Sequence, residues 1–309
     1  MDTVRLVYRD TDRTPVIYCI KEMARRHYDV DVQVLRVRDN DAYEAALFDG
    51  TGDMICEHIE YLYQEVAQGR HRATMFLAPV RQPDTQMVVR PEITGVEQLR
   101  GKRIAVRTAG RPYAITMRVR ALGLEGSVEL VPTPDTEVGR WGQWRRVVDG
   151  PCAATFMSHL HLPPALAAGL VPFPAPAFDI VGHFAHACSA DYALSHGEVV
   201  GRYVKSAIHA ACLMKLRRQE ALEIVSQESA KLMKLDENWP ELERWFDSIA
   251  GELELKPYPT PAAIANSYEI ACAEWPGGKG INPMALWDMH WVKQADDEGF
   301  IDRLIADLG

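Results

Sequence analysis

Two titratable residues, Glu57 and His58, stand at the end of an apolar stretch in the run D-M-I-C-E-H over residues 53–58. Glutamate and histidine transfer protons well when their surroundings tune them, so both are candidate general acids or bases. Cys56 is a candidate nucleophile, although the sequence gives no sign of a lowered thiol pKa. The alternative is structural, because a glutamate in the first turn of a helix is favoured by the helix dipole alone.

Two loops of related sequence could bind an anion. R-L-V-Y-R-D-T-D-R-T-P covers residues 5–15, and R-I-A-V-R-T-A-G-R-P covers residues 103–112. Each loop leads from an apolar strand into a proline-started helix, whose unpaired N–H groups and dipole attract anions, and its arginine adds a bidentate clamp for a carboxylate. The predicted ligand contacts are Asp10, Thr11, Arg13 and Thr14 in the first loop, and Arg107, Thr108, Gly110, Arg111 and Tyr113 in the second. The alternative is that these residues only start helices or are solvated.

A third segment, T-F-M-S-H-L-H over residues 155–161, follows another predicted strand. Thr155 and Ser158 are expected to donate hydrogen bonds to the ligand. Of His183 and His186, further along, one is expected to line the site and the other to be packed or on the surface, and His183 is the choice for the site. His159 and His161 stand two residues apart without a matching carboxylate motif, which is weak support for a metal. The sequence has no phosphate-binding glycine motif, zinc motif or nucleophile elbow, so we expect no cofactor and no metal.

A mostly parallel sheet covered by helices must position these residues, because strand and helix signals alternate through the first two-thirds of the chain. Thr14 and Thr260 each precede a proline and mark helix starts. The expected strands are 4–8, 30–37, 53–56, 74–79, 86–89, 103–107, 127–131 and 152–156, with extended segments at 170–173 and 178–184. The expected helices start at 14 and cover 41–48, 59–68, 112–122 and 144–148, and nearly all of the chain from Val199 onward is predicted helical.

The chain is expected to build two α/β lobes. A composition break near Pro91 and a return near Cys188 predict a first lobe of residues 1–85 and 190–309, ending in a helical tail, and an inserted second lobe of residues 90–185. Two crossing strands would join the lobes as a hinge. Because ligands bind at the carboxyl ends of strands in open α/β sheets, we expect the candidate residues to meet in a cleft between the lobes.

Composition narrows the classes of partner that the chain is expected to bind. The net charge of −9 argues against general affinity for nucleic acid, which needs a basic field. No apolar run approaches the roughly 20 residues of a membrane span. The N-terminus shows no signal-peptide pattern and the six cysteines are widely spaced, which favours reduced thiols in the cytoplasm. The expected partner is a small anionic molecule. A homodimer is left as an alternative, because the tryptophans of the helical tail suit either packing within the chain or burial at an interface.

The whole chain resembles the type II periplasmic-binding-protein superfamily, in particular its branch of sulfonate- and nitrate-binding proteins and thiamine-pyrimidine-synthase-like proteins. The first strand–loop–helix carries the resemblance, together with G-V-E-Q-L-R-G-K-R-I-A-V-R (95–107) and D-G-P-C-A-A-T-F (149–156). Locally, D-T-D-R-T (10–14) and D-M-I-C-E (53–57) resemble segments of 4,5-dihydroxyphthalate decarboxylase-like enzymes, with H-I-E at 58–60 in place of a serine-bearing part.

The resemblance implies the two-lobed α/β fold of this superfamily and two functions. One is a cytoplasmic lyase that decarboxylates a small aromatic or conjugated carboxylate. In that lyase Arg13 and Arg111 would hold carboxylates, and Glu57 or His58 would supply the proton that replaces carbon dioxide. The other is a non-catalytic binding protein for a small organic anion, of the kind that serves ABC transporters.

The Glu57-His58 pair and the missing signal peptide favour the lyase, so we expect the lyase. The lack of a strong catalytic constellation favours the binding protein. A desulfinase of aromatic sulfinates shares the fold and uses a cysteine in its first loop region, but Cys19 here falls within the first helix, so that mechanism is not carried over. A suicidal pyrimidine synthase is a third alternative, whose cysteine-rich motif this sequence lacks.

Overall fold

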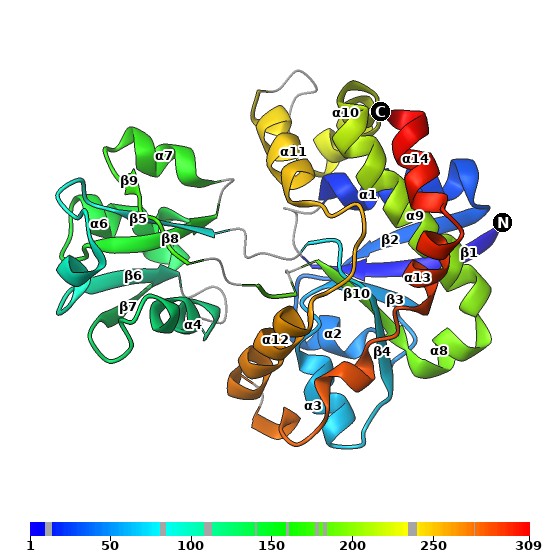
Figure 1. Ribbon diagram of the computed structural model, residues 1–309, viewed down its shortest axis with the longest axis horizontal. Helices are drawn as coiled ribbons and strands as arrows, with labels where there is room; N and C mark the ends of the chain where they lie inside the picture. Colours follow the sequence, from blue (N-terminus) through cyan, green and yellow to red (C-terminus); the bar gives the residue numbers. More distant parts are fainter. Residues whose placement is uncertain are drawn as a thin grey trace. The chain divides into compact units, whose positions relative to one another are not determined.

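The computed structural model describes residues 1–9, 14–80, 85–107, 113–139, 141–158, 161–176, 179–181, 184–233, 240–274 and 276–309. The chain splits into two compact units, drawn in Figure 1: residues 1–82 and 179–309 form unit 1, and residues 83–178 form unit 2. The sequence placed the return to the first unit later, near residues 185–190. The return comes earlier because the backbone at Asp179 and Val181 already hydrogen-bonds to Asn266 and Ser267 of unit 1. β10 (Ala185–Ser189) follows and pairs with strands of that unit.

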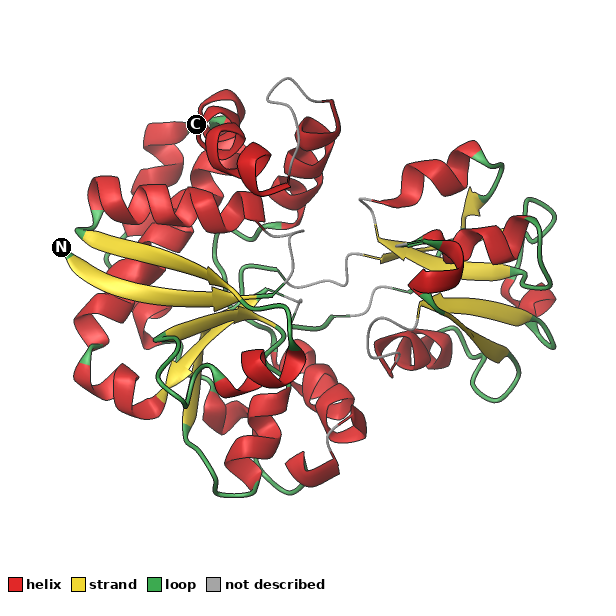
Figure 2. Cartoon of the chain, turned by 180° about the vertical axis from the view of Figure 1, so that it is seen from behind, coloured by secondary structure: helices red, strands yellow, loops and turns green. Residues whose placement is uncertain are grey.

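Unit 1 is built on a five-stranded sheet in the order β2-β1-β3-β10-β4 (Figure 2). Its other strands are β1 (Asp2–Tyr8), β2 (Val30–Arg36), β3 (Met54–Glu57) and β4 (Ala73–Leu77). β1 is parallel to both β2 and β3, and β10 runs antiparallel to β3 and β4. Three parallel strands therefore end side by side at one carboxyl edge of this sheet.

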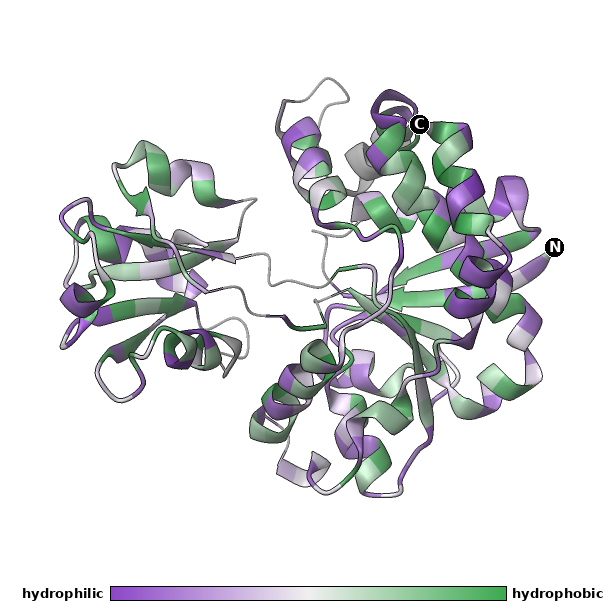
Figure 3. Ribbon diagram, viewed as in Figure 1, coloured by the Kyte–Doolittle hydropathy of each residue, from purple (hydrophilic) through white to green (hydrophobic). Residues whose placement is uncertain are grey.

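Helices cover both faces of the unit 1 sheet because its strands are apolar on both faces, as the green strands in Figure 3 show. Leu6 and Cys56 pack into the core of one face, and Val7 and Ile55 into that of the other. The first face carries α1 (Thr14–His27), α9 (Gly197–Leu216), α10 (Arg218–Met233), α11 (Pro240–Glu252), α13 (His290–Asp297) and α14 (Phe300–Leu308). The second carries α2 (Asn40–Ala45), α3 (Tyr61–Ala67) and α12 (Pro261–Glu274), and α8 (Ala190–Ser195) follows β10.

Unit 2 repeats the plan with a sheet in the order β7-β6-β8-β5-β9. The strands are β5 (Thr85–Val89), β6 (Arg103–Arg107), β7 (Glu129–Thr133), β8 (Ala154–Ser158) and β9 (Val171–Pro172), and the helices are α4 (Tyr113–Ala121), α5 (Asp135–Val138), α6 (Arg145–Val148) and α7 (Leu162–Ala167). β6 is parallel to β7 and β8, as β1 is to β2 and β3. The two related loops of the sequence thus follow equivalent strands in the two sheets.

The structure confirms the α/β class and corrects several elements. β10 was not expected, whereas the segment predicted to be extended at 178–184 has no strand among its described residues. The strands predicted at 127–131 and 152–156 lie two residues later, at Glu129–Thr133 and Ala154–Ser158. Short 3-10 turns lie at Val96–Leu99, Gly142–Trp144, Pro276–Gly278 and Pro283–Leu286. None of the described helices is long and apolar enough to cross a membrane.

Candidate functional site

Glu57 ends β3 with a buried carboxylate on strained backbone. Its φ is 98°, a region that residues other than glycine rarely adopt, and the residue is 2% exposed. Its Oε2 accepts a hydrogen bond of 2.8 Å from the backbone N–H of Arg9, directly after β1. The carboxylate therefore ties the end of β3 to the start of the first predicted anion loop. Such strain costs about 1–3 kcal/mol and clusters at functional sites, which makes Glu57 the leading candidate of unit 1.

The interpretation of Glu57 as a helix-dipole residue is wrong. Glu57 is the last residue of a strand, and α3 begins only at Tyr61. His58 is one-third exposed, and its Nδ1 lies 3.9 Å from Oε2 of Glu60, whose side chain is buried. The carboxyl end of β3 therefore brings together two buried carboxylates and one histidine. The described residues at this place carry more acidic than basic groups.

The thiols near this edge are unsuited to nucleophilic attack. Burial raises the pKa of the Cys56 thiol well above its ordinary value, and the nearby charge of Glu57 raises it further. In α1, burial raises the pKa of Cys19 to about 12. Because the thiolate is the nucleophile, neither cysteine is activated in the way that a catalytic cysteine requires.

Thr14 begins α1 and is fully buried. Its hydroxyl lies beside that of Tyr8, where it partly offsets the burial that raises the pKa of Tyr8. The geometry of this contact falls outside a hydrogen bond, and within the described chain Oγ1 of Thr14 has no partner. Several predicted contacts lie outside the described residues, namely Asp10, Thr11, Arg13, Thr108, Gly110, Arg111 and His183, and of Tyr113 only the backbone is described.

Arg107 ends β6 in unit 2, and two neighbours orient its guanidinium. Nε and Nη2 donate to the Asp135 carboxylate over 2.9 and 2.6 Å, and Cζ lies 4.7 Å from the centroid of the Trp141 ring. The side chains of Arg107 and Asp135 are 21% and 25% exposed. Sequence reasoning singled out Arg107 but missed Asp135 and Trp141, because no local pattern signals a pairing with residues so far along the chain.

Thr155 has a role inside the sheet, which corrects its prediction as a ligand contact. Its buried hydroxyl donates a hydrogen bond of 2.8 Å to the backbone carbonyl of Ala105 on β6, so that hydrogen is not offered to a ligand. Ser158 is the buried last residue of β8, at the carboxyl end of that strand, and its role as a ligand contact stays a prediction. Beyond it, the His161 ring stacks on Trp141 with centroids 5.4 Å apart.

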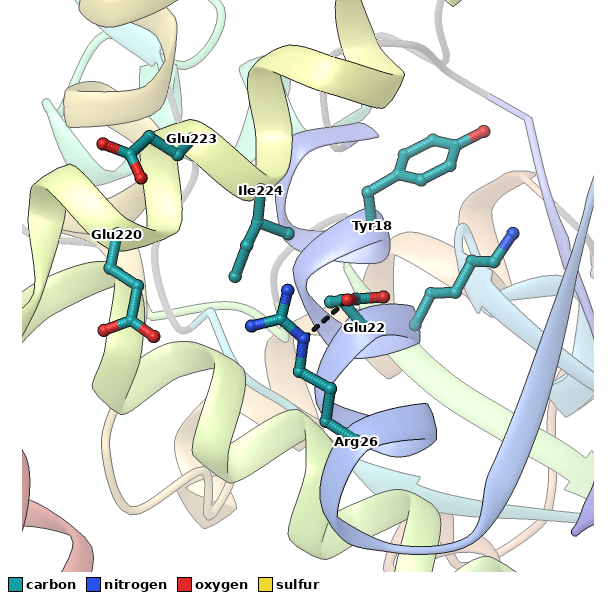
Figure 4. Close-up of a pocket in the computed structure, with 7 residues that line it drawn as sticks. Tyr18, Glu22, Arg26, Glu220, Glu223 and Ile224 are labelled. Carbon is teal, nitrogen blue, oxygen red and sulfur yellow. Dashed lines mark hydrogen bonds and ion pairs between the residues drawn. The ribbon is translucent and has the colours of Figure 1, made fainter.

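Two further features bear on where a ligand or metal could bind. Among the described residues, no group of three or more His, Cys, Asp or Glu side chains could hold a metal ion. A hollow of about 200 Å³ lies between α1 and α10. Figure 4 shows that Arg26, paired with Glu22, lies between Glu22 and the α10 residues Glu220 and Ile224. The hollow lies along the sides of two helices instead of at a sheet edge, and its acidic and basic side chains largely offset one another, so we do not assign it a ligand.

No protein-family model matches the sequence, and no curated protein matches it. Solved structures do match. A putative periplasmic sulfonate-binding protein of Methylobacillus flagellatus is 13% identical, with 98% of this chain and 96% of that chain covered and a TM-score of 0.66. The alkanesulfonate-binding protein of Xanthomonas axonopodis pv. citri, bound to MOPS, is 13% identical, with 94% and 99% covered and a TM-score of 0.56.

A third structure belongs to an enzyme. A mutant of the desulfurization enzyme DSZB, in complex with biphenyl-2-sulfinic acid, is 12% identical, with 96% of this chain and 100% of that chain covered and a TM-score of 0.60. At these identities the likenesses show a shared fold, and they extend over both units.

Proposed function

We propose that this chain, which has the α/β fold of type II periplasmic-binding proteins, is a binding protein for a small organic anion such as a sulfonate or a carboxylate. The observation that carries the proposal is the end-to-end likeness to sulfonate-binding proteins, which covers 94–98% of this chain in two of them. Both units are included in that likeness, so the shared feature is the whole two-unit architecture and not one common sheet.

The described residues suit binding better than turnover. Arg107 presents a guanidinium whose orientation is fixed by Asp135 and Trp141, and preorganised donors raise affinity because less freedom is lost on binding. In unit 1, Glu57 holds the N–H of Arg9, which directly precedes the predicted contacts of the first loop. In this role Glu57 is a positioning residue. We retain the cytoplasm as the proposed location, on the evidence of cysteines that form no disulfide.

Native mass spectrometry of the freshly purified chain tests the proposal. We expect a co-purified mass that dissociates on mild activation and that is recovered as a small anion. Calorimetric titration of that compound into stripped protein should then show saturable binding of one molecule per chain. A chain that carries no small molecule and binds none of a panel of sulfonates and carboxylates would overturn the proposal.

A second candidate function, the lyase, is favoured by one observation: the buried carboxylate of Glu57 sits on strained backbone. The fold is compatible with chemistry, because a desulfurization enzyme has it. In this alternative a carboxylate leaves as carbon dioxide, the carbon keeps the bonding electron pair, and Glu57 or His58 delivers the proton to that carbon.

The lyase function is tested by measuring carbon dioxide release from aromatic dicarboxylates. Glu57→Gln and His58→Asn each remove a titratable proton while keeping a polar side chain. Loss of the proton donor should lower turnover on the order of a hundredfold and leave affinity nearly unchanged. If the wild-type chain binds such a compound and returns it unaltered, the lyase is excluded for that compound and the binding protein stands.

A further inference from the structure

Two ion pairs of unit 2 involve arginines of β6, one at each end of that strand. The partner of the first is on β7, and the partner of the second is Asp135, the first residue of α5, two residues after β7. Arg103 and Glu129 pair at the amino ends of β6 and β7, with 2.8 Å between Nε and Oε2 and side chains 51% and 61% exposed. Arg107 and Asp135 pair at the carboxyl ends, where the side chains are less than half as exposed. An exposed pair contributes little to stability. In a partly desolvated pair the charges act more strongly on any further charge brought near them, because the effective dielectric is lower.

The carboxyl-edge pair has a third member, Trp141, whose backbone is strained. Its φ is 58°, which is rare for a bulky residue, yet this conformation brings the indole against the guanidinium of Arg107. The indole N–H is buried and, in the described ranges, has no acceptor. Trp141 thus keeps a strained backbone while it holds Arg107 at the carboxyl edge of the sheet. Strain of this kind at a sheet's carboxyl edge points to a ligand-binding site there.

The pair also limits the charge that a ligand can carry. Arg107 uses Nε and Nη2 on Asp135, and its third nitrogen, Nη1, makes no hydrogen bond to any described residue. One oxyanion oxygen can accept from Nη1. A second negative charge on the same head group would lie close to the Asp135 carboxylate, and like charges repel strongly where water is partly excluded.

We propose that Asp135 is a specificity-determining residue that makes the site select a singly charged oxoanion, such as a sulfonate, over a doubly charged one, such as a phosphate monoester. The inference rests on the proposed function and names the charge class of its ligand. Arg107 contacts the head group, and Asp135 and Trp141 act through Arg107 as positioning residues.

A matched pair of compounds tests this inference by calorimetry. Propanesulfonate carries one charge at every pH used. Propyl phosphate carries two charges at pH 8 and mostly one at pH 5, because its second pKa lies near 6. The wild-type chain should prefer propanesulfonate at pH 8, and Asp135→Asn should reduce that preference by about tenfold or more. Glu129→Gln is the matched control, because it removes one negative charge from the ion pair at the other end of β6, and it should leave the preference unchanged.

The outcomes distinguish failure of the inference about Asp135 from failure of the proposed binding function. If wild-type protein binds propanesulfonate and Asp135→Asn leaves the preference as it was, or if both variants shift it equally, the inference is wrong and the proposed function survives. If the wild-type chain binds no anion, both fail. Should Asp135→Asn not fold, the wild-type chain alone decides: the affinity for propyl phosphate relative to propanesulfonate must rise from pH 8 to pH 5, and a constant ratio overturns the inference.

Discussion

At the scale of single residues, Glu57 combines a favourable contact with an unfavourable backbone. Its carboxylate accepts the N–H of Arg9, and its φ of 98° is one that glycine adopts without strain and other residues do not. The two contributions can be separated by substitution, because alanine removes only the side-chain contact while glycine removes the contact and the strain.

We therefore expect Glu57→Gly to be more stable than Glu57→Ala by about 1 kcal/mol. The free energy of unfolding in urea measures this difference. Gln33, exposed on β2, is the control: there glycine should be the less stable substitution, as is usual in a strand. Alanine being the more stable substitution at both positions would show that the backbone at Glu57 is not strained.

We expect His186 on β10 to make stability depend on pH. It is fully buried, its Nδ1 lies 3.0 Å from the Tyr203 hydroxyl, and burial lowers its pKa to about 3. In the unfolded chain a histidine titrates near 6.5. Between these values the unfolded state binds a proton that the folded state does not, so stability is fully present above pH 6.5 and falls as the pH is lowered.

Acidification from pH 7.5 to pH 5 should therefore remove about 2 kcal/mol of stability through His186. Urea unfolding of the wild type and of His186→Asn at both pH values measures it, and the variant should lose less. His209, whose pKa burial lowers to about 4, contributes with the same sign in both proteins and so cancels. An equal loss in the two proteins would rule out His186 as the source.

At the scale of elements, the sequence predicted the strands and helix starts that nearby residues determine. Apolar runs predicted β1 and β6, and a threonine before a proline predicted the start of α12, because these signals act over a few residues. β10 was missed because A-H-A-C-S has no β-branched or large apolar residue, and its pairing to β3 and β4 comes from distant parts of the chain. The same distance hid the pairing of Arg107 with Asp135, and no residue pattern reveals a positive φ at Glu57 or Trp141.

The predicted cap of α12 leads to a test. Oγ1 of Thr260 accepts a hydrogen bond of 3.0 Å from the N–H of Ala263, and further along the helix the buried Oγ of Ser267 accepts from the N–H of Val181. Thr260→Ala should cost about 1 kcal/mol of unfolding free energy, and Thr260→Ser should cost much less because serine caps as well. Equal losses in chemical denaturation would show that the cap adds nothing.

At the scale of the whole molecule, unit 2 is one continuous stretch with its own hydrophobic clusters. One contains Met87, Ile104 and Phe156, and the other contains Val88, Val147 and Met157. Unit 1 is discontinuous, because its β10 and its α8–α14 are supplied by the chain after residue 179. Each unit therefore has a core of its own, as an independently folding domain requires.

A fragment of residues 83–178 should accordingly fold alone. We expect a single cooperative thermal transition by circular dichroism and dispersed amide resonances. A fragment of residues 1–82 should show neither, because it lacks β10 and α9, which complete its sheet and cover one face. Loss of cooperative unfolding in the 83–178 fragment would mean that its core depends on unit 1.

The central claim is that the chain recognises the negative charge of a small organic molecule. Titration of propanesulfonate and of its uncharged analogue propanesulfonamide into the same preparation of folded protein, followed by calorimetry, tests it most directly. The two ligands have almost the same shape, so a difference between them reports on charge. We predict saturable binding of the sulfonate to one site per chain, weakened by salt, and no detectable binding of the sulfonamide. Equal affinity for both compounds, or heat from neither, would contradict the claim.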